Sequence, residues 1–181
     1  MGFLRSLLGS KTAGKMACYD IAKPLTKEAI LCTGMSLGKY RNYIPEDDRI
    51  NGLAMVKAAL GYCHYFMHCF NRRYFRRYGM QKLTAAQNTL FPIIAFEFNQ
   101  HIGGVSNDVF FDSYNTFEMA LVRFLDDDSA ALSTFSSALC NVIFGEHSEN
   151  PLIIATIAEV AEEGVEHIGF DLKLVEMSRW Y

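Results

Sequence analysis

The feature that most constrains the fold is a regular apolar spacing between Leu53 and Tyr74. Hydrophobic side chains recur there every three or four residues, at Leu53, Val56, Leu60, Cys63, Met67, Phe70 and Tyr74. This is the spacing of a helix face that packs against a core. The opposite side of the same segment is also rich in apolar residues, at Met55, Ala59, Tyr62 and Phe66. A helix that is apolar on both sides is surrounded by other elements, so we expect this long helix at the centre of the domain.

Helix start and stop signals divide the rest of the chain into further helices. The expected starts are Thr26, Thr84 with Gln87, Asn107 or Asp108, the run 126–129, and Asn150 followed by Pro151. The expected ends are Pro45, Gly79, Gly103 with Gly104, Gly145 and a point near Ile168, with a shorter helix after Gly169. Alternating strand patterns and internal repeats are scarce or missing, and no flexible linker interrupts the chain. The sequence therefore predicts an all-α, single-domain helical bundle of about six or seven helices over residues 1–181, in which residues 1–20 could be a loosely attached segment.

Composition limits the class of protein. Half of the 181 residues are hydrophobic and 20% are charged, which is a globular composition with enough apolar residues for a core. The five cysteines are odd in number and never form a C-x-x-C pair, so we expect a reducing, cytoplasmic location rather than a disulfide framework. No apolar run reaches the roughly 18 residues of a membrane span, and no secretory leader is apparent. The net charge of −3 makes nucleic acid an unlikely partner.

The stretch GMSLG matches the G-x-S-x-G pattern of hydrolases, with Ser36 at the nucleophile position. That pattern has catalytic meaning only where a strand runs into a sharp turn and then a helix. The strands of such a sheet are not indicated here, and small residues such as Gly34 and Gly38 also permit close helix packing. We therefore interpret Ser36 as a structural residue and expect no catalytic site from this motif.

A second candidate is a metal site built from histidine and glutamate. His64 and His68 are four residues apart in the central helix, so they lie about 40° apart around it. Two further pairs have the same spacing in other expected helices. The candidate ligands are His64, His68, Glu97, His101, Glu163 and His167. Side chains that project inward from three helices could hold a transition metal, as in bundle-core metal sites. We keep this as an alternative hypothesis and otherwise expect no cofactor.

The strongest binding signal is the segment NRRYFRRYG, in which arginines form two neighbouring rows along one helix end. These arginines are Arg72, Arg73, Arg76 and Arg77. Arginine forks bind carboxylates with two parallel hydrogen bonds, so an acidic protein partner fits this surface. Cations at a helix C-terminus are also favoured by the helix dipole, and acidic residues of the same chain could pair with them.

Three further features leave alternatives open. The beginning MGFLRS fits the myristoylation pattern at Gly2, and the loop at 145–150 gathers Glu146, His147 and Glu149. Aromatic residues in several helices could enclose a small apolar ligand, at Phe66, Phe96, Phe117 and Phe135. The same aromatic surplus makes a homo-oligomer conceivable.

Taken with the segregated charge and the lack of a convincing catalytic constellation, these features favour a cytosolic protein-interaction module over an enzyme. A small inhibitor or immunity-type protein is an analogy of architecture alone.

Overall fold

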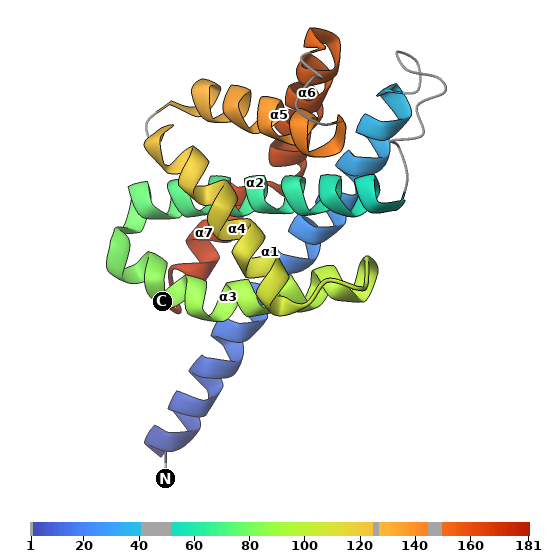
Figure 1. Ribbon diagram of the computed structural model, residues 1–181. Coiled ribbons are helices and arrows are strands. Elements are labelled where there is room, and N and C mark those ends of the chain that lie inside the picture. The colour runs from blue at the N-terminus through green and yellow to red at the C-terminus, as the bar shows by residue number, and fades with distance from the viewer. Residues whose placement is uncertain (1, 41–51, 125–126, 145–149) are drawn as a thin grey trace.

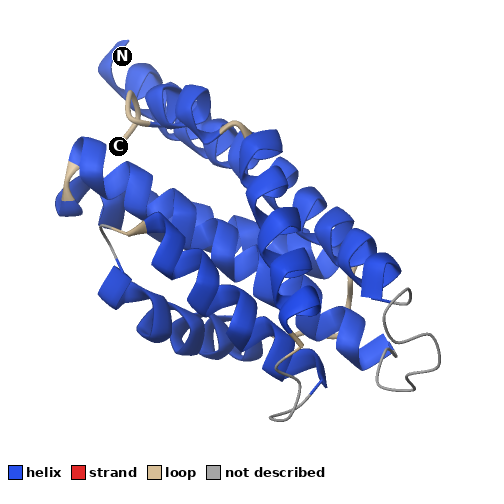
Figure 2. Cartoon of the chain, turned by 90° about the horizontal axis from the view of Figure 1, so that it is seen from above, coloured by secondary structure: helices blue, strands red, loops and turns tan. Residues whose placement is uncertain are grey.

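The computed structural model describes residues 2–40, 52–124, 127–144 and 150–181 of the chain. Within these ranges the chain forms seven α-helices and one 3₁₀ turn, without a strand (Figure 1; Figure 2). The elements are α1 (Gly2–Tyr40), α2 (Gly52–Tyr78), α3 (Met80–His101), α4 (Asn107–Leu121), η1 (Val122–Phe124), α5 (Asp128–Phe144), α6 (Pro151–Ile168) and α7 (Phe170–Met177). The predicted all-α helical bundle is confirmed.

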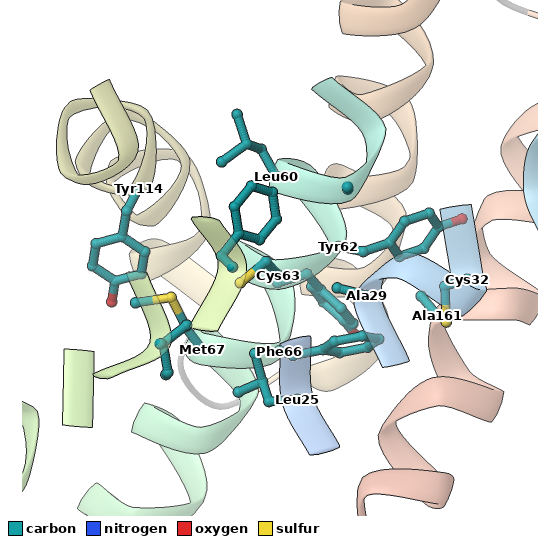
Figure 3. Close-up of a cluster of buried hydrophobic side chains, with 14 of the residues drawn as sticks. Leu25, Ala29, Cys32, Leu60, Tyr62, Cys63, Phe66, Met67, Tyr114 and Ala161 are labelled. Carbon is teal, nitrogen blue, oxygen red and sulfur yellow. The ribbon is translucent and has the colours of Figure 1, made fainter. Parts of the chain in front are cut away.

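The central position predicted for the segment from Leu53 to Tyr74 is also confirmed. This segment lies in α2, which crosses the middle of the molecule in Figure 1 and packs against α1, α3, α4, α5 and α6. Figure 3 shows why both sides of α2 are apolar: Tyr62 points toward α1 and α6, whereas Met67 lies on the side of Tyr114 of α4. Both sides of α2 are therefore covered, and most of its side chains are removed from water.

A close helix approach in the core involves Gly164 of α6. A Cβ atom at this position would lie 2.5 Å from Phe66 Cζ and 2.8 Å from Cys32 Sγ. Phe66 and Cys32 are both buried, and they belong to α2 and α1. Glycine at 164 thus lets three helices meet without a gap, and any larger side chain would displace a packed ring.

The expected helix start at Thr26 is wrong, because α1 runs without interruption from Gly2 to Tyr40 through Pro24. The Thr26 hydroxyl donates to the carbonyl oxygen of Ala22 at 2.9 Å, so it is used inside the helix rather than as a cap. Apolar residues on both sides of Pro24 are buried in one continuous row, and this burial outweighs the hydrogen bond that proline cannot donate. Figure 1 shows the first turns of α1 projecting beyond the other helices.

The capping box expected at Thr84 is wrong as well. α3 begins at Met80, immediately after the turn at Gly79, and the Thr84 hydroxyl donates to the Met80 carbonyl oxygen at 3.0 Å. Gly79 has a φ of 82°, which ends α2 as predicted and reverses the chain within one residue. The two helices therefore follow each other with no room for a separate cap.

The other expected helix ends agree more closely with the structure. Asn150 caps α6 by accepting a hydrogen bond from the Leu152 amide at 3.0 Å, and α6 ends at Ile168 before the left-handed Gly169. The N-cap of α4 is Ser106, one residue before the expected Asn107. Further expectations concern Pro45, Asp126 and the 145–149 loop with Glu146, His147 and Glu149, which lie outside the described residues.

Gly2, the candidate acylation site, is the first residue of α1. No helix in the described part of the chain is both long enough and apolar enough to cross a membrane.

Candidate functional site

Two of the predicted metal ligands, His64 and His68, are buried where α2 packs against α4. The His64 ring lies edge-on to Phe110, with 5.0 Å between centroids, and its Nδ1 is 3.5 Å from Ser113 Oγ. His68 Nδ1 is 2.9 Å from Glu118 Oε2. Within the described ranges, Nε2 of each imidazole has no hydrogen-bond partner. Burial lowers the pKa of His64 to about 3, so its imidazole is neutral at physiological pH.

The other four predicted ligands lie in different surroundings. Glu97 is buried on α3, His101 is exposed at the end of that helix, and Glu163 is half-buried on α6. His167 Nδ1 is 3.1 Å from Glu28 Oε1 of α1. Among the described residues, no three His, Cys, Asp or Glu side chains come together in a group that could hold a metal ion.

The predicted ligands therefore do not form one metal site. Residues four apart do share a helix face, as expected, but the faces have different neighbours. His64 and His68 are directed toward α4, whereas His167 is directed toward α1. The spacing of residues in a helix shows which side chains share a face, but it does not show which other helix packs against that face.

Ser36 has the structural role that we predict for it. It lies inside α1, is fully buried, and its hydroxyl is hydrogen-bonded to the Tyr62 hydroxyl of α2. The expected contribution of Gly34 and Gly38 to close helix packing is wrong, because a Cβ atom at either position would meet nothing within 4 Å. These two glycines lie on the exposed side of α1.

The aromatic residues proposed to enclose an apolar ligand fill other roles. Phe66 and Phe135 are fully buried, and the Phe135 ring stacks on Tyr65 with 4.3 Å between centroids. Phe117 is half-buried, and Phe96 is exposed on α3. None of the four lines either pocket described below.

Arg72, the first of the predicted partner-binding arginines, is inside the protein. Only 4% of Arg72 is exposed, and its guanidinium forms an ion pair with Asp128 at the start of α5. The same carboxylate lies 3.6 Å from Arg76 Nη1. Arg72 thus links α2 to α5 through this ion pair, and its contact with a partner protein stays a prediction.

The remaining arginines line an open pocket of about 260 Å³ at the end of α2, which we call the α2–α7 pocket. Its residues are Arg73, Arg76, Arg77 and Asp171. Arg77 Nη1 lies 3.7 Å from Asp171 Oδ1, in a pair whose side chains are 45% and 73% exposed. Arg73 is half-buried with its guanidinium over the Phe170 ring, 5.6 Å from the centroid. Among the residues that the structure describes, Arg73 is in no ion pair.

A larger pocket of about 460 Å³ adjoins this one, since Arg73 and Arg76 line both. We call it the α2–α5–α6 pocket after the helices that form it. Its residues are Tyr65, Cys69, Arg72, Arg73 and Arg76 of α2, Asp128, Ser129 and Leu132 of α5, and Glu162, Val165 and Glu166 of α6. It therefore combines a basic wall on α2, an acidic wall on α6 and an apolar lining.

The thiol in this pocket is not activated. Burial raises the pKa of Cys69 to about 11, although a hydrogen bond with Tyr65 and the nearby guanidinium groups of Arg73 and Arg72 partly offset this effect. Because the thiolate is the nucleophile, a thiol with so high a pKa is inert near neutral pH. The pocket thus offers charged and apolar groups for binding, and Cys69 supplies no reactive centre.

No protein-family model, curated protein or solved structure matches this chain. The proposals below therefore rest on the residues that line the two pockets. Sequence reasoning identified the arginines but missed Glu162, Glu166 and Asp171 as members of the same site. The signal available was the segregation of charge, because a basic helix end and acidic segments of one chain attract each other when they pack.

Proposed function

We propose that the protein is an interaction module that binds an acidic segment of a partner protein at the α2–α7 pocket. The observation that carries this proposal is the state of Arg73. Its guanidinium is held in place over the Phe170 ring while its hydrogen-bonding edge has no carboxylate partner among the described residues. A cation that is positioned in advance loses little conformational entropy when it binds a carboxylate.

Arg77 supports the same proposal. Its ion pair with Asp171 is largely exposed, and exposed ion pairs contribute only about 0–1 kcal/mol. A carboxylate of a partner can therefore replace Asp171 at little cost. Leu172, which follows Asp171 on α7, is 84% exposed and would add apolar contact area beside the charges.

The cysteines support a location in a reducing compartment such as the cytoplasm. None of the five is in a disulfide bond, and four of them are buried. A buried thiol behaves as a small hydrophobic group and needs no oxidising environment.

The test is a charge-reversal experiment with a matched control. Partners are captured from cells of the source organism with the wild-type protein, and each is then produced separately for calorimetric titration. Arg73→Glu with Arg77→Glu changes the charge by the same amount as Lys23→Glu with Lys27→Glu, which alters exposed lysines of α1. We expect the arginine reversal to weaken a direct partner by about tenfold or more, and the lysine reversal to have little effect.

A second variant tests the sign of the effect. Asp171→Asn removes the carboxylate that competes for Arg77, so we expect it to strengthen partner binding. The proposal is overturned if every partner binds the arginine reversal as tightly as the wild type. It is also overturned if the partner is only a second copy of this chain, which analytical size exclusion would reveal.

A further inference from the structure

Arg72 and Arg76 of the α2–α5–α6 pocket form ion pairs with Asp128, but the pocket also contains charges of opposite sign that are not paired with each other. On α2, Arg73 has no carboxylate partner among the described residues. On α6, Glu162 and Glu166 are one turn apart, both exposed, and likewise form no ion pair within the described chain. The Arg73 guanidinium and the two carboxylates thus line one pocket, with more than 4.0 Å between their nitrogen and oxygen atoms.

Apolar side chains share the pocket with these charges. Tyr65, Leu132 and Val165 come from α2, α5 and α6 respectively, so each of the three helices contributes apolar surface. Tyr65 is fixed by stacking on Phe135, and Leu132 belongs to the buried core. A pocket of about 460 Å³ is within the range of small-molecule sites.

We propose that this pocket binds a small zwitterionic ligand whose opposite charges are separated by an apolar body, such as a short apolar peptide with free termini or an ω-amino acid. The anionic group binds Arg73, the ammonium group binds Glu162 and Glu166, and the apolar body contacts Leu132 and Val165. This site shares Arg73 with the acidic-partner site proposed above, but it differs from that site because it needs the glutamates of α6 and does not need Arg77.

Charge complementarity excludes ligands with a single charge. An anion would bind Arg73 but would be repelled by the two glutamates, and a cation would meet the reverse problem. An uncharged apolar ligand would remove water from the unpaired Arg73, Glu162 and Glu166 without replacing their hydrogen bonds, which is costly. Only a ligand with both charges can pair with Arg73 on α2 and with the two glutamates on α6.

The probes are three compounds with the same six-carbon body: 6-aminohexanoate, hexanoate and hexylamine. Their binding to the full-length protein is measured by calorimetry and by ligand-observed NMR. We expect 6-aminohexanoate to bind at least about ten times more tightly than either singly charged compound. The proposal is overturned if the three bind equally, if a singly charged compound binds best, or if none binds at about 10 mM.

Two variants test which pocket side chains bind the carboxylate and the ammonium group of 6-aminohexanoate. Arg73→Gln is expected to reduce 6-aminohexanoate to the affinity of hexylamine, and Glu162→Gln with Glu166→Gln to reduce it to the affinity of hexanoate. Lys27→Gln, on α1, is the control and should leave the affinity unchanged. Zwitterion binding that survives both pocket variants would show that the compound binds elsewhere, which overturns the assignment.

A further variant separates this inference from the proposed function. Arg77→Gln should weaken the acidic partner while 6-aminohexanoate binds normally. A protein that binds the zwitterion without any acidic partner would refute only the interaction proposal, and the reverse result would refute only the ligand site.

Discussion

The buried imidazole of His64 gives the protein a specific weakness toward acid. His64 is 1% exposed and lies among the rings of Phe110, Tyr114 and Phe117. Burial lowers the pKa of His64 from 6.5 to about 3, and a hydrogen bond with the Phe110 backbone only partly offsets this effect. In the unfolded chain the same side chain is in water and titrates near 6.5.

The sign and size of the effect follow from this difference. The folded pKa is the lower one, so between about pH 6.5 and 3 the unfolded state binds a proton that the folded state does not. Stability from this group is therefore complete above pH 6.5 and falls as the solution is acidified, by about 1.4 kcal/mol for each pH unit. At pH 5 the loss is about 1.5 units, or about 2 kcal/mol, which is a large part of the stability of a typical domain.

The assay is urea unfolding followed by circular dichroism between pH 5 and 7.5, with linear extrapolation to water. His64→Phe places another ring among the three aromatic rings and removes the titrating group. We expect the free energy of unfolding of the wild type to fall by about 2 kcal/mol more than that of His64→Phe over this range. His101→Gln, a change at an exposed histidine, should keep the wild-type pH dependence.

An equal fall in stability for the wild type and His64→Phe would refute the reasoning. It would mean that His64 is hydrated or protonated in the folded state at pH 5. If phenylalanine proves too large for the site, His64→Leu repeats the measurement with a smaller apolar side chain.

Three further substitutions test the packing and capping of the helices by the same unfolding assay. Gly164→Ala should destabilise the protein by about 1–3 kcal/mol, because its Cβ would collide with Phe66 and Cys32 in a filled core; unchanged stability would show a gap there. Gly34→Ala should instead stabilise by about 0.5–1 kcal/mol, because the position is helical and its Cβ meets nothing; destabilisation would contradict this. Asn150→Ala should cost about 1 kcal/mol through the lost cap of α6, and Asn150→Ser should recover most of it.

Much of the fold could be predicted because α2 is apolar on both sides. That pattern, from Leu53 to Tyr74, specified a buried helix, and the structure surrounds it with five others. The helix starts were predicted less well, because a side chain that can cap a helix can also serve inside one. Thr26 and Thr84 both donate to carbonyl groups of the preceding turn, and burial of the neighbouring apolar residues decides that the helix continues.

The candidate site was only partly visible in the sequence, for a related physical reason. The arginines were recognisable because adjacent rows on one helix end are a local pattern. Their surroundings depend on which distant segments pack beside them, and local spacing contains no information about that. Arg72 illustrates the difference: both an acidic protein partner and acidic residues of the same chain fitted the sequence, and the structure pairs Arg72 with Asp128.

The contrast between Arg72 and Arg73 also supports the binding sites that we propose. Both are on α2 and both line the α2–α5–α6 pocket, yet Arg72 is buried and paired with a carboxylate whereas Arg73 has only an aromatic ring beneath it. A chain selected for stability alone would gain from pairing Arg73 with Glu162 or Glu166, because an unpaired charge that is partly removed from water is unfavourable. Sites that keep such unfavourable groups in place are typically sites of binding, since the ligand supplies the missing partner. The unpaired side chains of the pocket are Arg73 on α2 and Glu162 and Glu166 on α6. Experiments on function should therefore begin with these three residues.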